Sequence, residues 1–295
     1  TGIRIRGSDA TRINVTLNGI PYNDAESQGT FFVDLPDFAS SVGSIQIQRG
    51  VGTSSNGAGA FGGSINFSTN EVNREAYAEI NNTYGSFNTW KNTLKAGTGS
   101  HKGFTADIRL SRLSSDGFID RASSKLRSLF FTTAYIQPKT SIRLNIFTGH
   151  EKTYQAWYGI TEADLRSGLR HINYAGTEKP GDPYNNETDN YTQTHYQLFF
   201  NQLIHPRIHF NTAFFLTKGK GYYEQYKAAQ DFAAYGMSYP IINNDTVYSA
   251  DFVRQLWLDN DFYGNIFSFQ YTDKKTTATL GGAYTRYNGH HFGEV

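Results

Sequence analysis

The amino-acid sequence predicts a mainly β protein, in which a small α+β region at 1–70 precedes an antiparallel transmembrane β-barrel at 71–295. Three observations predict this fold. Nine segments that follow Ala76 alternate apolar and polar side chains with a period of two, as strands with one apolar face do. The connections between these segments alternate between short and long. The composition, with 29 Gly, 22 Phe and 20 Tyr, is typical of a chain with many strands.

Charge and composition argue against several classes of protein. The 27 Lys and Arg residues balance 26 Asp and Glu residues, whereas a nucleic-acid partner needs a clustered basic excess to neutralise phosphates. The absence of Cys removes disulfides, thiolate zinc sites and thiol nucleophiles. No apolar run approaches about 18 residues, so the sequence predicts no transmembrane helix.

The first region, 1–70, reads as short strands joined by turns. Segments 3–6 and 13–17 alternate as strands do, and Asn18-Gly19 followed by Pro21 is turn chemistry. A polar loop occupies 23–30. The run at 34–39 predicts a helical turn capped by Asp34, with Pro36 at an early helical position.

The segment 44–70 reads as a strand, a Gly-rich loop and a second strand. Glycines at this density allow positive φ angles and close backbone contact, so we expect a tight loop. A generic Gly-rich hairpin has the same features and stays an alternative. A nucleotide-binding loop is disfavoured, because the GxxxxGK[ST] motif is missing and a strand, not a helix, follows the glycines.

The second region contains the nine predicted strands. Its short connections include 138–140 and 205–206, whereas the connections 152–191 and 217–255 are much longer than is usual in compact domains. Short turns on one side and long loops on the other are the layout of an outer-membrane barrel. A water-soluble sandwich shows the same alternation and is the alternative. The predicted strands are 77–84, 89–98, 103–112, 125–137, 141–151, 192–204, 207–217, 256–271 and 276–287.

The alternation also predicts which side chains meet lipid. Leu144, Leu198, Phe214 and Phe267 fall on the apolar face of their strands, and Asn145 and Asn211 fall on the polar face. Tyr and Trp gather near several strand ends, as in the aromatic belts of membrane proteins. We therefore expect a basic substitution to be costly on the apolar face and mild on the polar face.

The run IQIQRGVGTSSNGAGAFGGSINFST at 45–69 resembles the end of the plug domain of TonB-dependent outer-membrane receptors. The resemblance rests on Arg49-Gly50, on the small-residue loop, on Gly62-Gly63 and on the short strand that follows. IRIRG at 3–7 and VTLNGIP at 15–21 resemble two further plug signatures in the same order, although Val51 stands where many members carry Pro. The resemblance implies the C-terminal part of a plug at 1–70 and the N-terminal part of a barrel at 71–295, and hence an internal fragment. Large plugged transporters have about 22 strands.

The resemblance implies import of a bulky, scarce nutrient across the outer membrane of a Gram-negative bacterium. The leading ligand is a ferric-siderophore or another ferric chelate, and vitamin B12, haem or a glycan are alternatives within the family. The implied partners are the TonB energy-coupling complex, reached through an N-terminal segment, and outer-membrane lipid around a monomeric barrel; no nucleic acid and no cofactor are implied. HExxH and GxSxG motifs are missing, so the sequence predicts no enzyme. A passive porin or adhesin barrel and a soluble β-rich binding protein are the alternatives from other classes.

The resemblance also implies which residues bind the ligand. Two arginines that follow plug strands, Arg6 and Arg49, are expected to pair with carboxylates of the barrel. No catalytic residue and no metal ligand is expected. The expected ligand-binding residues at the plug tip are Asn23, Asp24, Glu26, Gln28, Ser54, Ser55 and Asn56, and those on the outer loops are Tyr154, Trp157, Tyr158, Tyr222, Tyr223 and Tyr226.

Overall fold

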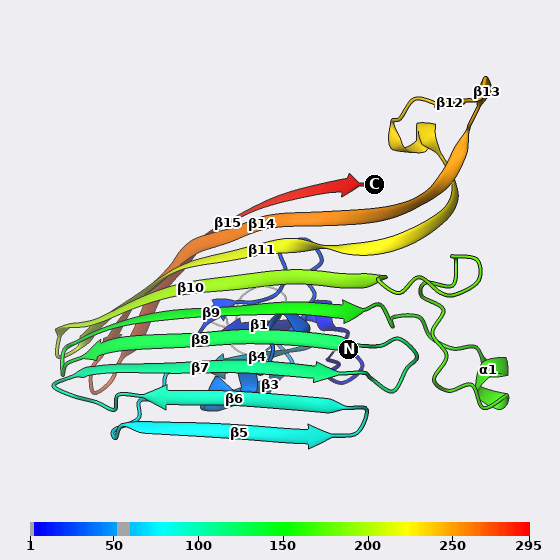
Figure 1. Cartoon of the computed structure of the whole chain (residues 1–295). Helices are drawn as coiled ribbons and strands as arrows, with labels where there is room; N and C mark the ends of the chain where they lie inside the picture. The colour runs from blue at the N-terminus through cyan, green and yellow to red at the C-terminus, as the bar shows by residue number, and fades with distance from the viewer. Residues whose placement is uncertain (1–2, 52–59) are drawn as a thin grey trace.

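A large antiparallel sheet and a smaller mixed sheet make up the protein (Figure 1). The computed structural model describes residues 3–51 and 60–295. In this part of the chain the smaller region packs against one face of the large sheet. The predicted mainly β fold, with a small α+β region ahead of a large antiparallel sheet, is confirmed.

The smaller sheet has the order β2-β1-β4-β3, in which β1 and β4 run parallel and the other pairs antiparallel. The predicted strand 3–6 is wrong, because only an isolated bridge between Ile5 and Ser8 forms there. The turn after β1 has positive φ angles at Asn18 and Gly19, which these two residue types tolerate. The elements are η1 (Ala10–Arg12), β1 (Ile13–Leu17), β2 (Ile20–Pro21), η2 (Phe32–Asp34), η3 (Phe38–Ser41), β3 (Ser44–Arg49) and β4 (Gly63–Ser68).

The helical turn predicted at 34–39 is present as two short 3-10 turns, and its predicted cap is wrong. Asp34 is the last residue of η2 and not an N-cap. Asp37 takes the N-cap position of η3, in a left-handed conformation and without a side-chain capping bond. Both carboxylates instead point away from the helix ends and contact the large sheet, as described below.

The large sheet is a meander in which each strand pairs with the next, from β5 at one edge to β15 at the other. All nine predicted strands are present. Its strands are β5 (Tyr77–Gly85), β6 (Thr89–Gly97), β7 (Phe104–Ser115), β8 (Ser124–Ile136), β9 (Thr140–Tyr154), β10 (Thr188–His205), β11 (Ile208–Asp231), β14 (Ser249–Thr272) and β15 (Thr277–Glu294).

Much of the predicted loop 217–255 is strand. The ladder between β11 and β14 continues to the pair Asp231 and Ser249, beyond the neighbouring strands. The sequence missed this extension because its residues are largely polar or glycine on both faces, so that no apolar alternation marks it. The extension carries η5 (Phe232–Tyr235) and the hairpin β12 (Ile241–Ile242) and β13 (Asp245–Thr246).

The long and short connections lie at opposite ends of the sheet, as predicted. In Figure 1 the tight turns between β8 and β9 and between β10 and β11 are at the left end. The connection 155–187, with α1 (Glu162–Arg166), and the β12–β13 hairpin are at the right end. No helix in the described residues is long and apolar enough to cross a membrane.

The two faces of the large sheet differ. Leu198, Phe214 and Phe267 are 43%, 55% and 38% exposed on the outer face, away from the smaller region. Asn145 lies on the inner face and is fully buried, where it accepts a hydrogen bond from Thr132. The expectation that a charged substitution at Asn145 is mild is therefore revised, because a longer charged side chain has no space or solvent there.

Candidate functional site

Aromatic side chains join the smaller region to the inner face of the large sheet. Phe38 of η3 contacts Phe130 of β8 and Phe147 of β9, with ring centroids 6.4 and 5.2 Å apart. Tyr22 lies 5.9 Å from the ring of His195, which stacks on Phe147. These rings belong to one apolar core that spans the two sheets. The small region is thus fixed against the sheet, and the loop that follows β2 has a defined position.

At Gly149 of β9, the segment 34–36 lies directly against the large sheet. A Cβ atom on this residue would overlap the backbone oxygen of Asp34 and would lie 2.5 Å from Cδ of Pro36. Any larger residue would push η2 and η3 away from the large sheet. The glycine therefore permits the contact between the segment 34–37 and β9.

Asp37 makes the main ionic contact between the two regions. Its carboxylate lies 2.5 Å from Nζ of Lys91 and 3.3 Å from Nη1 of Arg109, and the side chains of Asp37 and Arg109 are both 4% exposed. The hydroxyls of Thr93 and Ser111 donate to the same carboxylate at 2.9 and 2.7 Å. Burial alone would raise the pKa of Asp37, but these hydrogen bonds outweigh burial and hold the pKa below its usual range.

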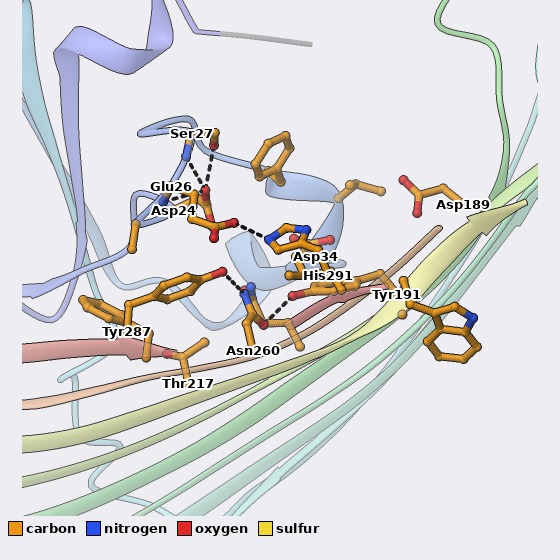
Figure 2. A pocket seen from close by; sticks show the side chains of 18 of the residues that line it. Asp24, Glu26, Ser27, Asp34, Asp189, Tyr191, Thr217, Asn260, Tyr287 and His291 are labelled. Carbon is orange, nitrogen blue, oxygen red and sulfur yellow. Dashed lines mark hydrogen bonds and ion pairs between the residues drawn. The ribbon is translucent and has the colours of Figure 1, made fainter. Parts of the chain in front are cut away.

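A cavity of about 720 Å³ lies between the loop 21–34 and the inner face of β9, β10, β11, β14 and β15. It is on the side of the long connections. Figure 2 shows Asp24 and Glu26 of the loop on one side of the cavity, with Asn260 and Tyr287 of the sheet on the other. We call the smaller region the plug and the large sheet the wall, and we call the cavity between them the plug–wall pocket. Its volume is in the range of small-molecule sites.

The loop on the plug side of the pocket is held by its own polar groups. Asn23 accepts a hydrogen bond from the backbone N–H of Val15 at 2.7 Å and donates to the carbonyl of Ile13 at 2.9 Å. Asp24 accepts from the backbone N–H groups of Glu26 and Ser27. These bonds fix the loop, so that Glu26 is placed where it pairs with His291 of β15 at 2.8 Å.

Three further carboxyl groups line the inner end of the pocket, one from η2 and two from strands of the large sheet. Asp34 and Glu151 are 7% and 2% exposed, and the two side chains share a hydrogen bond. Asp189 at the start of β10 adds a third negative group. Burial, with the nearby charges of Asp189 and Asp24, raises the pKa of Asp34 against the hydrogen bond to Glu151. The described lining includes neither Lys nor Arg.

Aromatic rings form the rest of the wall. The rings of Tyr191, Tyr223, Phe262 and Tyr287 line the pocket, whereas Tyr222, Trp257 and Phe292 pack together on the outer face of the sheet, on the same side as Phe214 and Phe267. The hydroxyls of Tyr191 and Tyr287 bond to the side-chain amide of Asn260 (Figure 2). The pocket therefore offers broad ring surfaces beside hydrogen-bonding groups and carboxylates. Among the described residues, no group of His, Asp or Glu is arranged to hold a metal ion.

The structure brings some of the predicted ligand-binding residues together and leaves others apart. Those whose side chains line the pocket are Asn23, Asp24, Glu26 and Tyr223, whereas the ring of Tyr222 packs on Trp257 on the outer face. Gln28 lies outside the lining, and its amide donates to the carbonyl of Ala25. Ser54, Ser55 and Asn56 lie outside the described residues.

The other predicted aromatics have different places. Tyr154 is 5% exposed and packs under the connection 155–187, where its hydroxyl bonds to the carbonyl of Tyr184. Tyr226 bonds to Asp251. Trp157 and Tyr158 are 58% and 52% exposed, and Trp157 meets Tyr223 edge to face at 6.1 Å. Their role in binding stays a prediction, since all four lie outside the pocket lining.

Arg6 and Arg49 are exposed, and no ion pair joins either residue to the described part of the chain. Their contact with barrel carboxylates stays a prediction. The ionic contact that is present, through Asp37, was missed by the sequence reading. Asp34, Glu151 and Asp189 were missed too, because residues so far apart in sequence give no local signal that they converge.

Comparisons with known proteins agree with this architecture. Residues 1–64 match the model of the TonB-dependent receptor plug domain. No curated protein matches the sequence. The fold is similar to the siderophore receptor PiuA from Acinetobacter baumannii (13% identity, TM-score 0.69), covering 98% of this chain and 40% of that one. It is also similar to the ferric citrate transporter FecA, with 16% identity and a TM-score of 0.73, covering 98% of this chain and 41% of that one. The copper transporter OprC is similar with 14% identity and a TM-score of 0.69, covering 99% of this chain and 42% of that one. The chain thus spans about two fifths of the length of these structures.

Proposed function

With this chain identified as a TonB-dependent receptor, we propose that it serves to import a bulky metal chelate across the outer membrane of a Gram-negative bacterium. The proposed ligand is a ferric-siderophore or another ferric chelate, and the proposed energy source is the TonB complex. The single observation that carries this proposal is the plug–wall pocket. Its position between the plug loop and the wall couples ligand contact to plug movement.

The shape of the pocket supports a bulky ligand. A cavity of about 720 Å³ exceeds what a hydrated metal ion needs and suits a chelate. The rings of Tyr191 and Tyr223 supply apolar area, and Asn260 supplies hydrogen-bonding groups that fix orientation. We propose no catalytic reaction at this site.

The contacts of the plug support energised import. The core around Phe38 and Phe147 and the ion pairs of Asp37 hold the plug against the wall. Separating them exposes apolar surface and leaves the buried guanidinium of Arg109 without its partner. A passive pore has no use for such an attachment, whereas a transporter driven by TonB can apply work to break it.

Growth under iron limitation tests the proposal. The full-length receptor is expressed in a bacterial host that lacks its own siderophore receptors, and growth is measured on a panel of ferric chelates, vitamin B12, haem and glycans. We expect the receptor to restore growth on at least one ferric chelate, and deletion of the host's tonB to abolish it. Two variants form a matched pair: Tyr223→Ala in the pocket should lose this growth, and Tyr248→Ala on the exposed outer connection should keep it. Growth that does not depend on TonB, or that appears only on a glycan, would contradict the proposal.

A further inference from the structure

The charged side chains that line the plug–wall pocket are mainly acidic. Five carboxyl groups line it, and the described lining contains no Lys or Arg. The lining imidazole of His195 is 5% exposed and packed between rings, so that it brings no positive charge. The lining carboxyl groups are those of Asp24, Glu26, Asp34, Glu151 and Asp189.

These carboxyl groups differ in the hydrogen bonds and ion pairs that they already make within the protein. Asp24 accepts backbone N–H groups of its own loop, and Glu26 pairs with His291. Asp34 and Glu151 instead bond to each other, and no ion pair joins either of them, or Asp189, to a described cation. A low-dielectric site makes such groups costly without an opposite charge. A hydrogen bond between two carboxyl groups requires a proton on one of them, so the Asp34–Glu151 pair carries at most one negative charge, and Asp189 adds a second carboxyl group beside it without a described cationic partner.

Aromatic rings lie close to this negative charge. Tyr22 packs beside His195 on the plug side, and Tyr191 of β10 contributes its ring and hydroxyl from the wall. Tyr223 of β11 is the register partner of Asp189 and adds a further ring on the inner face. Ring faces attract cations through their quadrupole, and this attraction adds to that of carboxylates when both are desolvated. Ring faces offer no such attraction to an anion.

We infer that the plug–wall pocket selects metal chelates that carry a positively charged group, such as a protonated amine, which would lie against Asp34, Glu151 and Asp189. This inference rests on the proposed function and names its ligand class more narrowly. An anionic chelate would meet repulsion from Asp189 and from the charge shared by the Asp34–Glu151 pair, with no Lys or Arg of the described lining to offset it. The raised pKa of Asp34 agrees with a site that lacks its cation when empty.

A series of chelates with one core and three charges tests the inference. Ferrioxamine B is a ferric trihydroxamate with a pendant ammonium, and its N-acetyl and N-succinyl derivatives are neutral and anionic at that position. Binding of each to the purified full-length receptor is measured by quenching of tryptophan fluorescence at pH 7.5. We expect affinity to fall roughly tenfold or more from the cationic to the neutral chelate, since a hydrogen bond to a charged group is lost, and to fall again for the anionic chelate.

Two variants connect this preference to the pocket. Asp189→Asn should reduce the ratio of cationic to neutral affinity, while Asp245→Asn, an exposed site on β13, should leave the ratio unchanged. Asp34→Asn should act in the same direction as Asp189→Asn, and Asp189→Asn serves alone if the Asp34 variant does not fold. If the ratio of cationic to neutral affinity is the same in Asp189→Asn as in wild type, the assignment is overturned.

The outcomes separate this inference from the proposed function. Equal binding of the three chelates, or tighter binding of the anionic one, overturns the charge preference and leaves chelate import standing. Absence of binding by all three also contradicts the inference, whereas the TonB-dependent growth on other ferric chelates decides the proposed function independently.

Discussion

Asp37 connects the plug to the wall through one carboxylate. It pairs with Lys91 and Arg109, and it accepts hydrogen bonds from Thr93 and Ser111. Breaking a buried pair by removing one partner is costly, because the remaining charge stays buried. Arg109 is in that position, with 4% of its side chain exposed.

Asp37→Asn should therefore destabilise the plug–wall contact by about 3 kcal/mol. The measurement is protease sensitivity of the segment that contains η3 in the folded receptor, which should increase in the variant. Asp116→Asn, on an exposed connection, is the control and should behave as wild type. Unchanged protection of η3 in Asp37→Asn would show that the pair contributes little.

The same carboxylate predicts a dependence on pH. A carboxyl whose folded pKa is lowered stabilises the folded state fully above its unfolded pKa, and this stability is lost as pH falls through the folded pKa. Wild-type plug attachment should thus stay constant between pH 5 and 7 through Asp37 and weaken below about pH 4. Asp34 has the opposite sign, since its raised pKa makes its contribution decline as pH rises. When the free energy of unfolding is measured from pH 3 to pH 6, it should fall toward acid pH in wild type and fall less in Asp37→Asn. Equal slopes of this free energy against pH in the two proteins would contradict the assignment.

Residue roles were predictable where they depend on local sequence. Turn chemistry at Asn18-Gly19 and the polar tip at Asp24 and Glu26 were found from the sequence, because each depends on neighbours within a few residues. The roles of Asp34 and Asp37 were not. As residues near a helical turn they resemble caps, and their actual partners belong to strands about 50 to more than 100 residues later in the chain.

At the scale of elements, η2, η3 and β9 depend on the absence of a side chain at Gly149. Gly149→Val should separate these elements, since even a Cβ overlaps Asp34 and Pro36. We expect the variant barrel to remain assembled while the plug becomes loose, seen as a rise in ion conductance of the full-length receptor in planar bilayers. Gly281→Val is the control, because a Cβ there has its nearest contact at 3.0 Å, and its three nearest atoms all belong to β14 and none to the plug. No change of conductance in Gly149→Val would contradict the close contact.

The two faces of β11 make a second prediction at this scale. Phe214 is 55% exposed on the outer face, whereas Asn211 is half-buried on the inner face. Phe214→Lys should cost about 2–4 kcal/mol of folding free energy in a bilayer if this part of the strand lies near the midplane, and Asn211→Lys should cost less. Urea unfolding from liposomes measures both. Equal costs would contradict the assignment of the outer face to lipid.

The strands themselves were predictable because one face of each is apolar and the other polar. This period marked all nine strands of the large sheet, but it ended where both faces become polar, so that the extension of β11 to Asp231 was assigned to a loop. The segment 3–6 shows the converse error. Its alternation is real, yet no neighbouring strand pairs with it beyond the bridge at Ile5. Alternation predicts strand propensity, whereas pairing depends on the partner.

At the scale of the whole molecule, the plug and the wall together form the pocket. The wall that the plug covers is rich in polar groups, including Asn145, Gln197 and Arg143. Such a surface can face water if the plug is removed, so the barrel should persist without it. We thus expect the plug to be a removable block and not a structural core of the wall.

Conductance tests this claim most directly. The full-length receptor, a variant without residues 1–70, and a control without the exposed hairpin 241–246 are each inserted into planar bilayers. We expect large, persistent conductance from the variant without the plug and low conductance from the other two. Equal, low conductance from the first two proteins would contradict the central claim that this region blocks the barrel.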